Sequence, residues 1–411
     1  MKGMQSGDIV ECGFAGGKRK GTFITERNGM AVVKLDSGYN IGVPPGCCSF
    51  TSRLPAELSR RTVISQNSEL PELSIVSTGG TIASRIDYRT GSVTSQSDSA
   101  AILSAIPELA TVANYSTRSL YTILSENMTP LIWQELARAV FYEIQRGVSG
   151  VIVTHGTDTM GYSAAALSFM IDSPVPIIFV GSQRSADRPS SDNAMNALCA
   201  AKAATSDIGE VAVVMHATTN DDMCAIHRGT RVRKMHTSRR DAFQSMGITP
   251  LGSIAYPSLE VKLRSGVVRR STRKPALHEK LDENCALVYF YPGMPAEILG
   301  TYAGYHGLVL AGTGLGHIST AMIPGLQQLV DGGTAIMMTS QCLNGKVCDR
   351  VYDTGRDLLD AGVIEGGDML PEVALVKLMW VLGNESDPVK IRKLLQTDLK
   401  GECMRRCIHE L

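Results

Sequence analysis

A chain of 411 residues, 44% of them apolar, is too long for one ordinary hydrophobic core, so its length predicts two or three globular domains. The 40 lysines and arginines balance the 40 aspartates and glutamates, which removes any global electrostatic case for binding nucleic acid or a membrane surface. The chain has no signal-peptide core at its start and no apolar run of the ~18 residues that a membrane span needs. Its 10 dispersed cysteines are typical of reduced thiols, so we expect a cytoplasmic protein.

Residues 1–52 predict a small β module of their own. The dipeptide Asn28-Gly29 is a strong hairpin signal between two strand-like runs. Short strands are expected at residues 8–12, 21–27, 31–35 and 40–43. Strands this closely spaced are typical of a small SH3-like β-barrel. Residues 53–71 are polar and punctuated by prolines, and we interpret them as a linker.

Strands and helices alternate over residues 72–262, which predicts a doubly wound α/β domain with a parallel sheet. Its strands are expected at 73–77, 150–154, 175–180 and 211–215, and its helices at 131–144, 163–170 and 193–204. The charged residues 263–283 predict a solvated connection between domains. Residues 284–411 predict a second, smaller α/β domain, with strands at 286–291, 307–311 and 334–338 and helices at 320–330, 357–361 and 370–381.

Two turns rich in hydroxyl groups follow predicted strands. The run LSIVSTGGTIA at 73–83 ends a strand in a turn that carries Thr78 and Thr81, and the run VIVTHGTDTMGY at 151–162 ends another strand in a second such turn. Because open α/β sheets bind ligands beyond the carboxyl ends of their strands, both turns could line one cleft. A single Thr-Gly-Gly-Thr turn is also compatible with a plain strand-to-helix connection, so the second turn carries the functional interpretation.

A threonine hydroxyl is a poor nucleophile until a neighbouring base takes its proton. Asp158 stands beside Thr157 in the second turn, and a lysine such as Lys234 would complete the pairing if the fold brings it near. A buried lysine next to a carboxylate can act as a base once its pKa falls. We therefore hypothesise that Thr81, Thr157 and Asp158 belong to one site.

The ordered pair of motifs, TGGTI at 78–82 and HGTDT at 155–159, resembles the two signature motifs of the bacterial-type L-asparaginases. The resemblance covers about residues 72–395. It implies an asparaginase-like two-domain body with parallel sheets, here preceded by the SH3-like β-barrel. In that body residues 72–262 would be the catalytic domain and residues 284–411 the smaller C-terminal domain.

The resemblance also implies a role for several residues. Thr81 matches the threonine that accepts the acyl group, and Tyr88 matches a tyrosine on a flexible lid that assists it. Thr157, Asp158 and a lysine would form a second, triad-like set, in which Asp158 also holds the α-amino group of the substrate. Gly80 would take part in substrate binding.

A further segment and the lysine are assigned in the same way. Ser125 and Glu126 match a segment that grips the α-carboxylate, with Glu126 in place of the glutamine that is frequent there. Secreted asparaginases have their lysine near the position of Gln244, whereas cytosolic-type members have it in a Lys-x-His context that Lys234 and His236 match. Lys234 is therefore assigned to the triad, and the alternative is one more exposed base in a basic segment.

Two other candidates are weaker. The run GTGLGH at 312–317 resembles a dinucleotide-binding turn, but its sixth position is His317 and no phosphate-binding lysine follows, so we expect a close turn. His155 could act as a general base, but the resemblance implies a structural use of this position. No metal or organic cofactor is expected in this chain.

The β module distinguishes this chain from plain asparaginases, which begin close to their equivalent of Leu73. A preceding module, together with the segments 231–243 and 351–359, resembles the asparaginase-like subunits of archaeal glutamyl-tRNA(Gln) amidotransferases. That resemblance implies release of ammonia from glutamine or asparagine. A partner, the E subunit of such an enzyme, would use the ammonia with ATP and Mg²⁺ to convert Glu-tRNA(Gln) to Gln-tRNA(Gln), in a heterotetramer built on a homodimer of this chain.

Two alternatives stay open at this point. One is a free-standing cytosolic L-asparaginase with an added oligomerisation module. The other is an inactive module that only binds an amino acid. The complete set of Thr81, Tyr88, Thr157, Asp158 and Lys234 argues against the inactive module, since decay usually removes a member.

Overall fold

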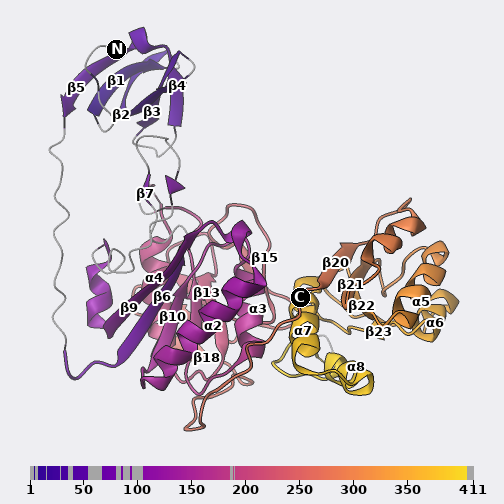
Figure 1. The fold of residues 1–411 in the computed structure, drawn as a ribbon. Helices are drawn as coiled ribbons and strands as arrows, with labels where there is room; N and C mark the ends of the chain where they lie inside the picture. The colour runs from indigo at the N-terminus through magenta and orange to yellow at the C-terminus, as the bar shows by residue number, and fades with distance from the viewer. Residues whose placement is uncertain are drawn as a thin grey trace.

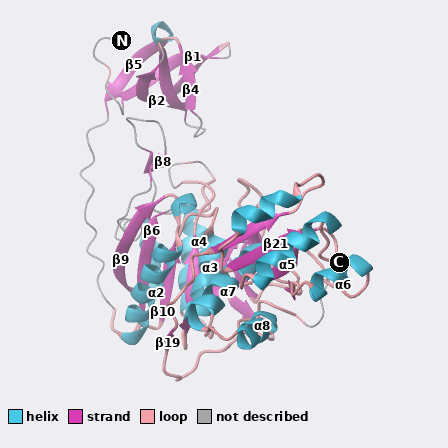
Figure 2. Cartoon of the chain, turned by 45° about the vertical axis from the view of Figure 1, so that its right-hand side comes forward, coloured by secondary structure: helices cyan, strands magenta, loops and turns pink. Residues whose placement is uncertain are grey.

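The computed structural model describes residues 4, 8–14, 16–27, 29–35, 40–53, 67–79, 85–86, 93–94, 105–185, 188 and 190–404. Among these residues no helix is both long enough and apolar enough to cross a membrane. Three larger sheets organise the described chain, and both views show the N-terminal one as a separate unit (Figure 1, Figure 2).

The N-terminal module is a 5-stranded antiparallel sheet in the order β4-β3-β2-β1-β5. Its elements are β1 (Asp8–Phe14), β2 (Gly17–Arg27), β3 (Met30–Leu35), β4 (Asn40–Val43), the 3-10 helix η1 (Pro45–Cys47) and β5 (Cys48–Arg53). Its small core contains Val10, Cys12, Phe23, Ala31, Val33 and Val43. The sequence pattern does not predict β5, because this strand is largely polar and its one large apolar side chain, Phe50, is exposed.

Strand β5 also corrects an expectation about the cysteines. Cys12 and Cys48 form a disulfide, whereas the sequence predicts reduced thiols throughout. The two cysteines are 36 residues apart, and they meet because the antiparallel register of β1 and β5 places them directly opposite each other. Only this pairing, which the spacing of the cysteines does not reveal, brings the two sulfur atoms together.

The central sheet has 8 strands in the order β18-β17-β14-β13-β12-β10-β6-β9. Its strands are β6 (Glu72–Gly79), β9 (Asn114–Ile123), β10 (Gly150–Thr154), β12 (Ile177–Val180), β13 (Val211–His216), β14 (Met223–Arg228), β17 (Gly252–Ala255) and β18 (Val261–Leu263). The stretch from β9 to β13 is parallel, as predicted. β14, β17 and β18 extend it with antiparallel pairs that the sequence pattern does not predict.

Alternate residues of the parallel strands face two different cores. Val151, Val153 and Phe179 pack with α2 (Pro130–Gln145) and α3 (Met160–Met170) on one face. Ile152 and Ile178 pack with α4 (Asn193–Ala204) on the other face. This alternation produces the doubly wound arrangement, since a strand buried on both faces presents successive side chains to opposite sides. The shorter helices of this domain are the 3-10 helices η3 (Pro107–Thr111) and η4 (Ser125–Asn127).

The C-terminal domain is built on a 4-stranded parallel sheet in the order β20-β21-β22-β23. Its elements are β20 (Cys285–Tyr289), η5 (Ala296–Tyr302), β21 (Gly307–Gly312), η6 (Thr320–Met322), α5 (Ile323–Asp331), β22 (Ala335–Ser340), α6 (Asp353–Asp360), β23 (Ile364–Glu365), α7 (Pro371–Asn384) and α8 (Pro388–Gln396). Helix α8 is not predicted from the sequence, although Asp387 caps it and Pro388 opens it, which is a readable start signal.

Helix α7 joins the two larger sheets. It packs against α3 of the central domain and against β21 of the C-terminal domain, and Figure 1 shows it between them. Within α7, the fully buried Lys377 forms an ion pair with the fully buried Glu402 at 2.6 Å and donates to the carbonyls of Leu395 and Thr397. The last described residues of the chain are thus fastened to the helix that holds both domains together.

Three small two-stranded sheets complete the fold: β7 (Arg85–Ile86) with β8 (Val93–Thr94), β11 (Ile171–Asp172) with β19 (Ala276–Leu277), and β15 (Val232–Lys234) with β16 (Phe243–Ser245). The pair β11–β19 lies partly in the connection that the sequence predicts to be solvated. Within that connection the Arg270 guanidinium is half-buried and donates to the carbonyls of Ala204 and Ser206. The connection therefore contacts the central domain at Arg270, while most of its other residues are exposed or half-buried.

A buried carboxyl group lies under the glycine-rich turn 312–317. The Asp349 side chain is fully buried, and neither of its oxygens has a hydrogen-bond partner among the described residues. A Cβ atom at Gly316 would lie 2.9 Å from Asp349 Oδ1, so the turn packs closely here as its glycines indicate. Burial first, and the neighbouring Glu365 second, raise the pKa of Asp349 to about 7.

Replacing Asp349 by Asn should stabilise the protein in a pH-dependent way. The raised pKa means that the folded protein binds the proton more tightly than the unfolded chain, so the wild type loses stability as the pH rises from about 4 to about 7. Asparagine carries no charge to bury, and we expect D349N to melt at least about 2 °C above the wild type at pH 8, with a smaller difference at pH 5. Thermal unfolding at both pH values measures this, and an equal shift at both would contradict the buried-acid explanation.

Candidate active site

The two hydroxyl-rich turns follow the ends of two neighbouring strands, and these ends lie side by side in the sheet. β6 and β10 are parallel and adjacent, with Ser77 opposite Thr154, so the chain emerges from both at one edge of the sheet. Thr78 is buried and its hydroxyl donates to the Thr154 carbonyl at 3.1 Å. That bond uses the Thr78 hydroxyl to join the two strand ends. Thr81, the predicted nucleophile, lies outside the described residues, as do Gly80 and Tyr88.

His155 is held by its surroundings. The Trp133 indole donates to Ser163 Oγ at 2.9 Å, and Ser163 Oγ lies 2.8 Å from His155 Nε2. Because the Gly156 carbonyl, 2.6 Å from Nδ1, can only accept, Nδ1 carries the proton of the neutral ring and Nε2 accepts from the Ser163 hydroxyl. Burial lowers the pKa of His155 to about 4. These contacts make His155 a neutral structural support for the turn.

The structure brings Thr157, Asp158 and Lys234 together. The Lys234 ammonium donates to Thr157 Oγ1 at 2.9 Å and to Asp158 Oδ1 at 2.7 Å. Thr157 is 9% exposed and the Lys234 side chain 14%, whereas the Asp158 side chain is 68% exposed. The lysine is thus sheltered with its hydroxyl partner, and the carboxylate faces the open side. This geometry disagrees with the alternative that Lys234 is one more exposed base, while its catalytic role stays a prediction.

The β15–β16 hairpin places Lys234. Val232 and Phe243 are buried in the main core, and Lys234 is directly opposite Phe243 in the hairpin register. Gln244, where secreted asparaginases have their lysine, is opposite Arg233 on the second strand and is exposed. The first strand of the hairpin therefore supplies the only lysine that the described structure brings to Thr157.

Ser125 lies against the second turn. It begins η4, is 5% exposed, and its backbone carbonyl accepts a hydrogen bond from Thr159 Oγ1 at 2.6 Å. A Cβ atom at Gly156 would lie 2.7 Å from the Ser125 Cβ, so only glycine permits this approach. Glu126 is exposed beside it. The predicted carboxylate-binding segment and the triad turn are therefore packed together, and their roles toward a substrate stay predictions.

A small cavity of about 160 Å³ opens beside the lysine, lined by Asp158, Gly161, Tyr162, Val232, Arg233, Lys234 and Glu372. Glu372 belongs to α7, and it accepts a hydrogen bond from Arg233 at 3.3 Å. Burial raises the pKa of Glu372, and the charge of Arg233 acts in the opposite direction. No sequence signal links Glu372 to a site 139 residues away, so this neighbour comes from the fold alone.

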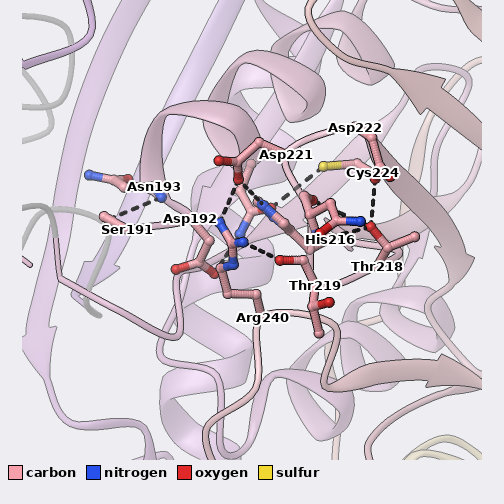
Figure 3. Close-up of polar contacts among 12 residues, drawn as sticks. Ser191, Asp192, Asn193, His216, Thr218, Thr219, Asp221, Asp222, Cys224 and Arg240 are labelled. Atoms are coloured by element: carbon pink, nitrogen blue, oxygen red, sulfur yellow. Dashed lines mark hydrogen bonds and ion pairs between the residues drawn. The ribbon is translucent and has the colours of Figure 1, made fainter. Parts of the chain in front are cut away.

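A polar network supports the same sheet edge at the ends of β12 and β13, and Figure 3 shows the part of it around Asp192 and His216. The buried Asp192 accepts hydrogen bonds from the backbone amides of Gln183 and Arg184, both at 2.9 Å. Asn196 donates to Asp192 at 3.0 Å and contacts His216 Nδ1 through its Oδ1 at 2.6 Å. Helix α4 thereby fastens two strand ends to each other, a connection that the sequence pattern does not predict.

Among the described residues, no group of three or more His, Cys, Asp or Glu side chains could hold a metal ion. The described site instead brings together the hydroxyl of Thr157 and the carboxylate of Asp158, beyond the end of β10, with the ammonium of Lys234 from the antiparallel β15–β16 hairpin.

Both larger domains match known protein families. The family profile "Asparaginase, N-terminal" matches residues 72–266, and "Glutaminase/Asparaginase C-terminal domain" matches residues 284–395. The chain is 52% identical to the D subunit of glutamyl-tRNA(Gln) amidotransferase from Methanosarcina barkeri, over 98% of this chain and 99% of that protein. It is 53% identical to the protein of the same name from Archaeoglobus fulgidus, over 93% and 91% of the two chains.

Solved structures give the same fold. The thermostable L-asparaginase from Thermococcus kodakarensis superposes with a TM-score of 0.72 and 33% identity, over 81% of this chain and 99% of that one. L-asparaginase I from Vibrio cholerae superposes with a TM-score of 0.69 and 27% identity, over 82% and 99% of the two chains.

Proposed function

The chain belongs to the asparaginase family, in the group of glutamyl-tRNA(Gln) amidotransferase D subunits, and we propose that it releases ammonia from glutamine for the amidation of Glu-tRNA(Gln). The observation that carries the chemical part of this proposal is the pair of hydrogen bonds from Lys234 to Thr157 and Asp158. Such a set can accept and return a proton beside a threonine nucleophile.

The extent of the matches favours an amidotransferase component over a free-standing asparaginase. The superpositions include 99% of each of the two solved L-asparaginases, but only 81% and 82% of this chain. The amidotransferase D subunit from Methanosarcina barkeri accounts for 98% of this chain. The β module of residues 1–52 is thus shared with an amidotransferase component, so we propose that it serves the complex and not the amide hydrolysis.

The reaction that we propose begins at Thr81. Its hydroxyl oxygen attacks the side-chain amide carbon of glutamine while a neighbouring base takes the hydroxyl proton. Nearby donors stabilise the oxyanion, the C–N bond breaks, and the amide nitrogen takes up a proton and leaves as ammonia. Water then hydrolyses the acyl-enzyme, which releases glutamate and restores the Thr81 hydroxyl.

The other residues have supporting parts in this proposal. Thr157 and Lys234 relay protons to and from the reacting atoms, and Tyr88 assists Thr81 from the lid. Asp158 holds the α-amino group of glutamine with its exposed carboxylate, and Ser125 lies where the α-carboxylate would bind, with Gly80 and Glu126 as further contacts. None of these steps requires a metal ion or an organic cofactor in this chain.

The partners belong to the same proposal. We propose a cytoplasmic heterotetramer in which a homodimer of this chain binds two copies of the E subunit of the amidotransferase, where ATP and Mg²⁺ are used. The formal net charge of zero supports a division of labour in which the partner holds most of the tRNA.

Replacing Thr81 by Val should abolish ammonia release from glutamine, by at least about a thousandfold, because valine keeps the shape but lacks the nucleophilic oxygen. Coupled detection of ammonia and glutamate measures this. Thr78→Val is the matched control, since Thr78 spends its hydroxyl on the Thr154 carbonyl. T78V should lower thermal stability and keep most of the turnover, and a T81V protein with full activity would remove the proposed nucleophile.

Replacing Lys234 by Met should lower kcat by about a hundredfold or more, because a general acid–base group contributes an effect of this size. Lys262→Met is the control, since the Lys262 side chain is 72% exposed and pairs only with Glu260 among the described residues. Steady-state kinetics on glutamine and on asparagine give kcat and KM for both variants. Unchanged turnover in K234M would contradict a catalytic role for Lys234 and leave it as a basic side chain without a part in the reaction.

A further inference from the structure

The position of Lys234 depends on a very short hairpin. β15 and β16 have 3 residues each and pair only with each other. Two-stranded sheets of this size have little stability of their own. Val232 anchors the base of the hairpin and Phe243 anchors its other end, directly opposite Lys234, where the exposed loop 235–239 begins. All five residues of this loop are exposed, so the loop itself can be held only by a contact from its flanking residues to another segment of the chain.

Arg240 makes that contact. Its guanidinium donates to Asp221 Oδ1 at 2.5 Å and to the backbone carbonyl of Thr219. Figure 3 shows the Arg240 side chain reaching from its own loop toward Asp221 and Thr219. Among the described residues, these are the only side-chain hydrogen bonds from residues 235–241 to another segment of the chain. The Arg240 side chain is 12% exposed, so most of it is enclosed between the two loops.

The loop that receives Arg240 is itself well held. Thr218 Oγ1 donates to Asp222 Oδ1 at 2.5 Å, and the Tyr256 amide donates to the Asp222 carbonyl at 2.7 Å. Asp221 Oδ1 also contacts Nε2 of the fully buried His216 at 3.2 Å. The loop 217–222 is therefore held in place by its own hydrogen bonds. Through His216 it is also connected to the network that links β12 and β13 to α4.

We infer that Arg240 is a positioning residue that holds the Lys234 hairpin against the loop 217–222 and so keeps the lysine ammonium on Thr157. The inference rests on the proposed amidase function and adds to it a residue that touches neither the substrate nor the triad. Arg240 acts through the five residues of the loop 235–239 and through the backbone bond that the Met235 amide donates to the Ala242 carbonyl at 2.6 Å. Because the Asp221 side chain is 57% exposed, the ion pair itself contributes little to global stability.

The test compares Arg240→Gln with Arg239→Gln. Arg239 forms an ion pair with Asp241 at 2.6 Å inside the same loop, so R239Q removes the same charge without breaking the bridge to Asp221 and Thr219. R240Q should lower kcat for glutamine by about tenfold or more with KM changed less than about threefold, since small misplacements of a catalytic group have effects of this size. R239Q should retain kcat within about twofold.

Two further variants separate positioning from charge and from folding. Arg240→Lys keeps the charge but lacks the planar fork that reaches a carboxylate and a carbonyl together, so its kcat should lie between those of R240Q and the wild type. Asp221→Asn should lower kcat by less than R240Q does, because it leaves the bond from Arg240 to the Thr219 carbonyl in place. The double variant should be no worse than R240Q alone, because R240Q already removes both bonds. The melting temperature should move little in all five variants, the double variant included.

Hydrogen exchange makes the outcome independent of the amidase assignment. The amide of Met235, bonded to the Ala242 carbonyl, should exchange at least about tenfold faster in R240Q than in R239Q or the wild type. A wild-type protein with no amidase activity would sink the proposed function and leave this measurement to decide the role of Arg240. Equal exchange in R240Q and R239Q, or equal kcat in the two, would overturn the inference.

Discussion

The candidate site depends on one interaction, the contact of the Lys234 ammonium with Thr157 and Asp158, which are 77 and 76 residues away along the chain. Hydrogen bonds of 2.7 to 2.9 Å tolerate little displacement, so every element that places either end must be fixed. The register of β6 and β10 fixes the threonine end. The lysine end is fixed by the β15–β16 hairpin, which follows the buried ion pair of Arg231 with Asp368 at 2.9 Å, a link to the C-terminal domain.

The sequence predicts those features of the fold and the site whose signals lie among neighbouring residues, and it does not predict features that depend on residues far apart in the chain. The strand 150–154, the helix 193–204 and the two turns were readable because apolar periodicity and glycine placement are properties of neighbouring residues. Lys234 is one candidate lysine by residue type, and only the resemblance of Lys234 and His236 to a motif assigns it to the site. The Cys12–Cys48 disulfide and the cavity wall at Glu372 depend on contacts between distant segments, and no spacing rule encodes them.

The antiparallel strands β14, β17 and β18 illustrate the same limit within one sheet. β17 and β18 have only 4 and 3 residues, and β14 is a continuous buried run with half-buried ends, so none of them offers a long alternation of buried and exposed side chains. They nevertheless support the loop 217–222, which ends at the start of β14 and receives Arg240. The strands that the sequence pattern does not predict are thus the ones that support the loop bound by Arg240, and through it the position of Lys234.

The central claim is that the nitrogen released by this chain is handed to a tRNA-bound glutamate. The most direct measurement supplies the chain and its co-purified partner with Glu-tRNA(Gln), ATP, Mg²⁺ and glutamine labelled with ¹⁵N in its side-chain amide, in the presence of unlabelled ammonium. Mass spectrometry of the amino acid recovered from the tRNA should find glutamine that carries the ¹⁵N label. Recovery of glutamate alone, or of glutamine without the label, would contradict the account.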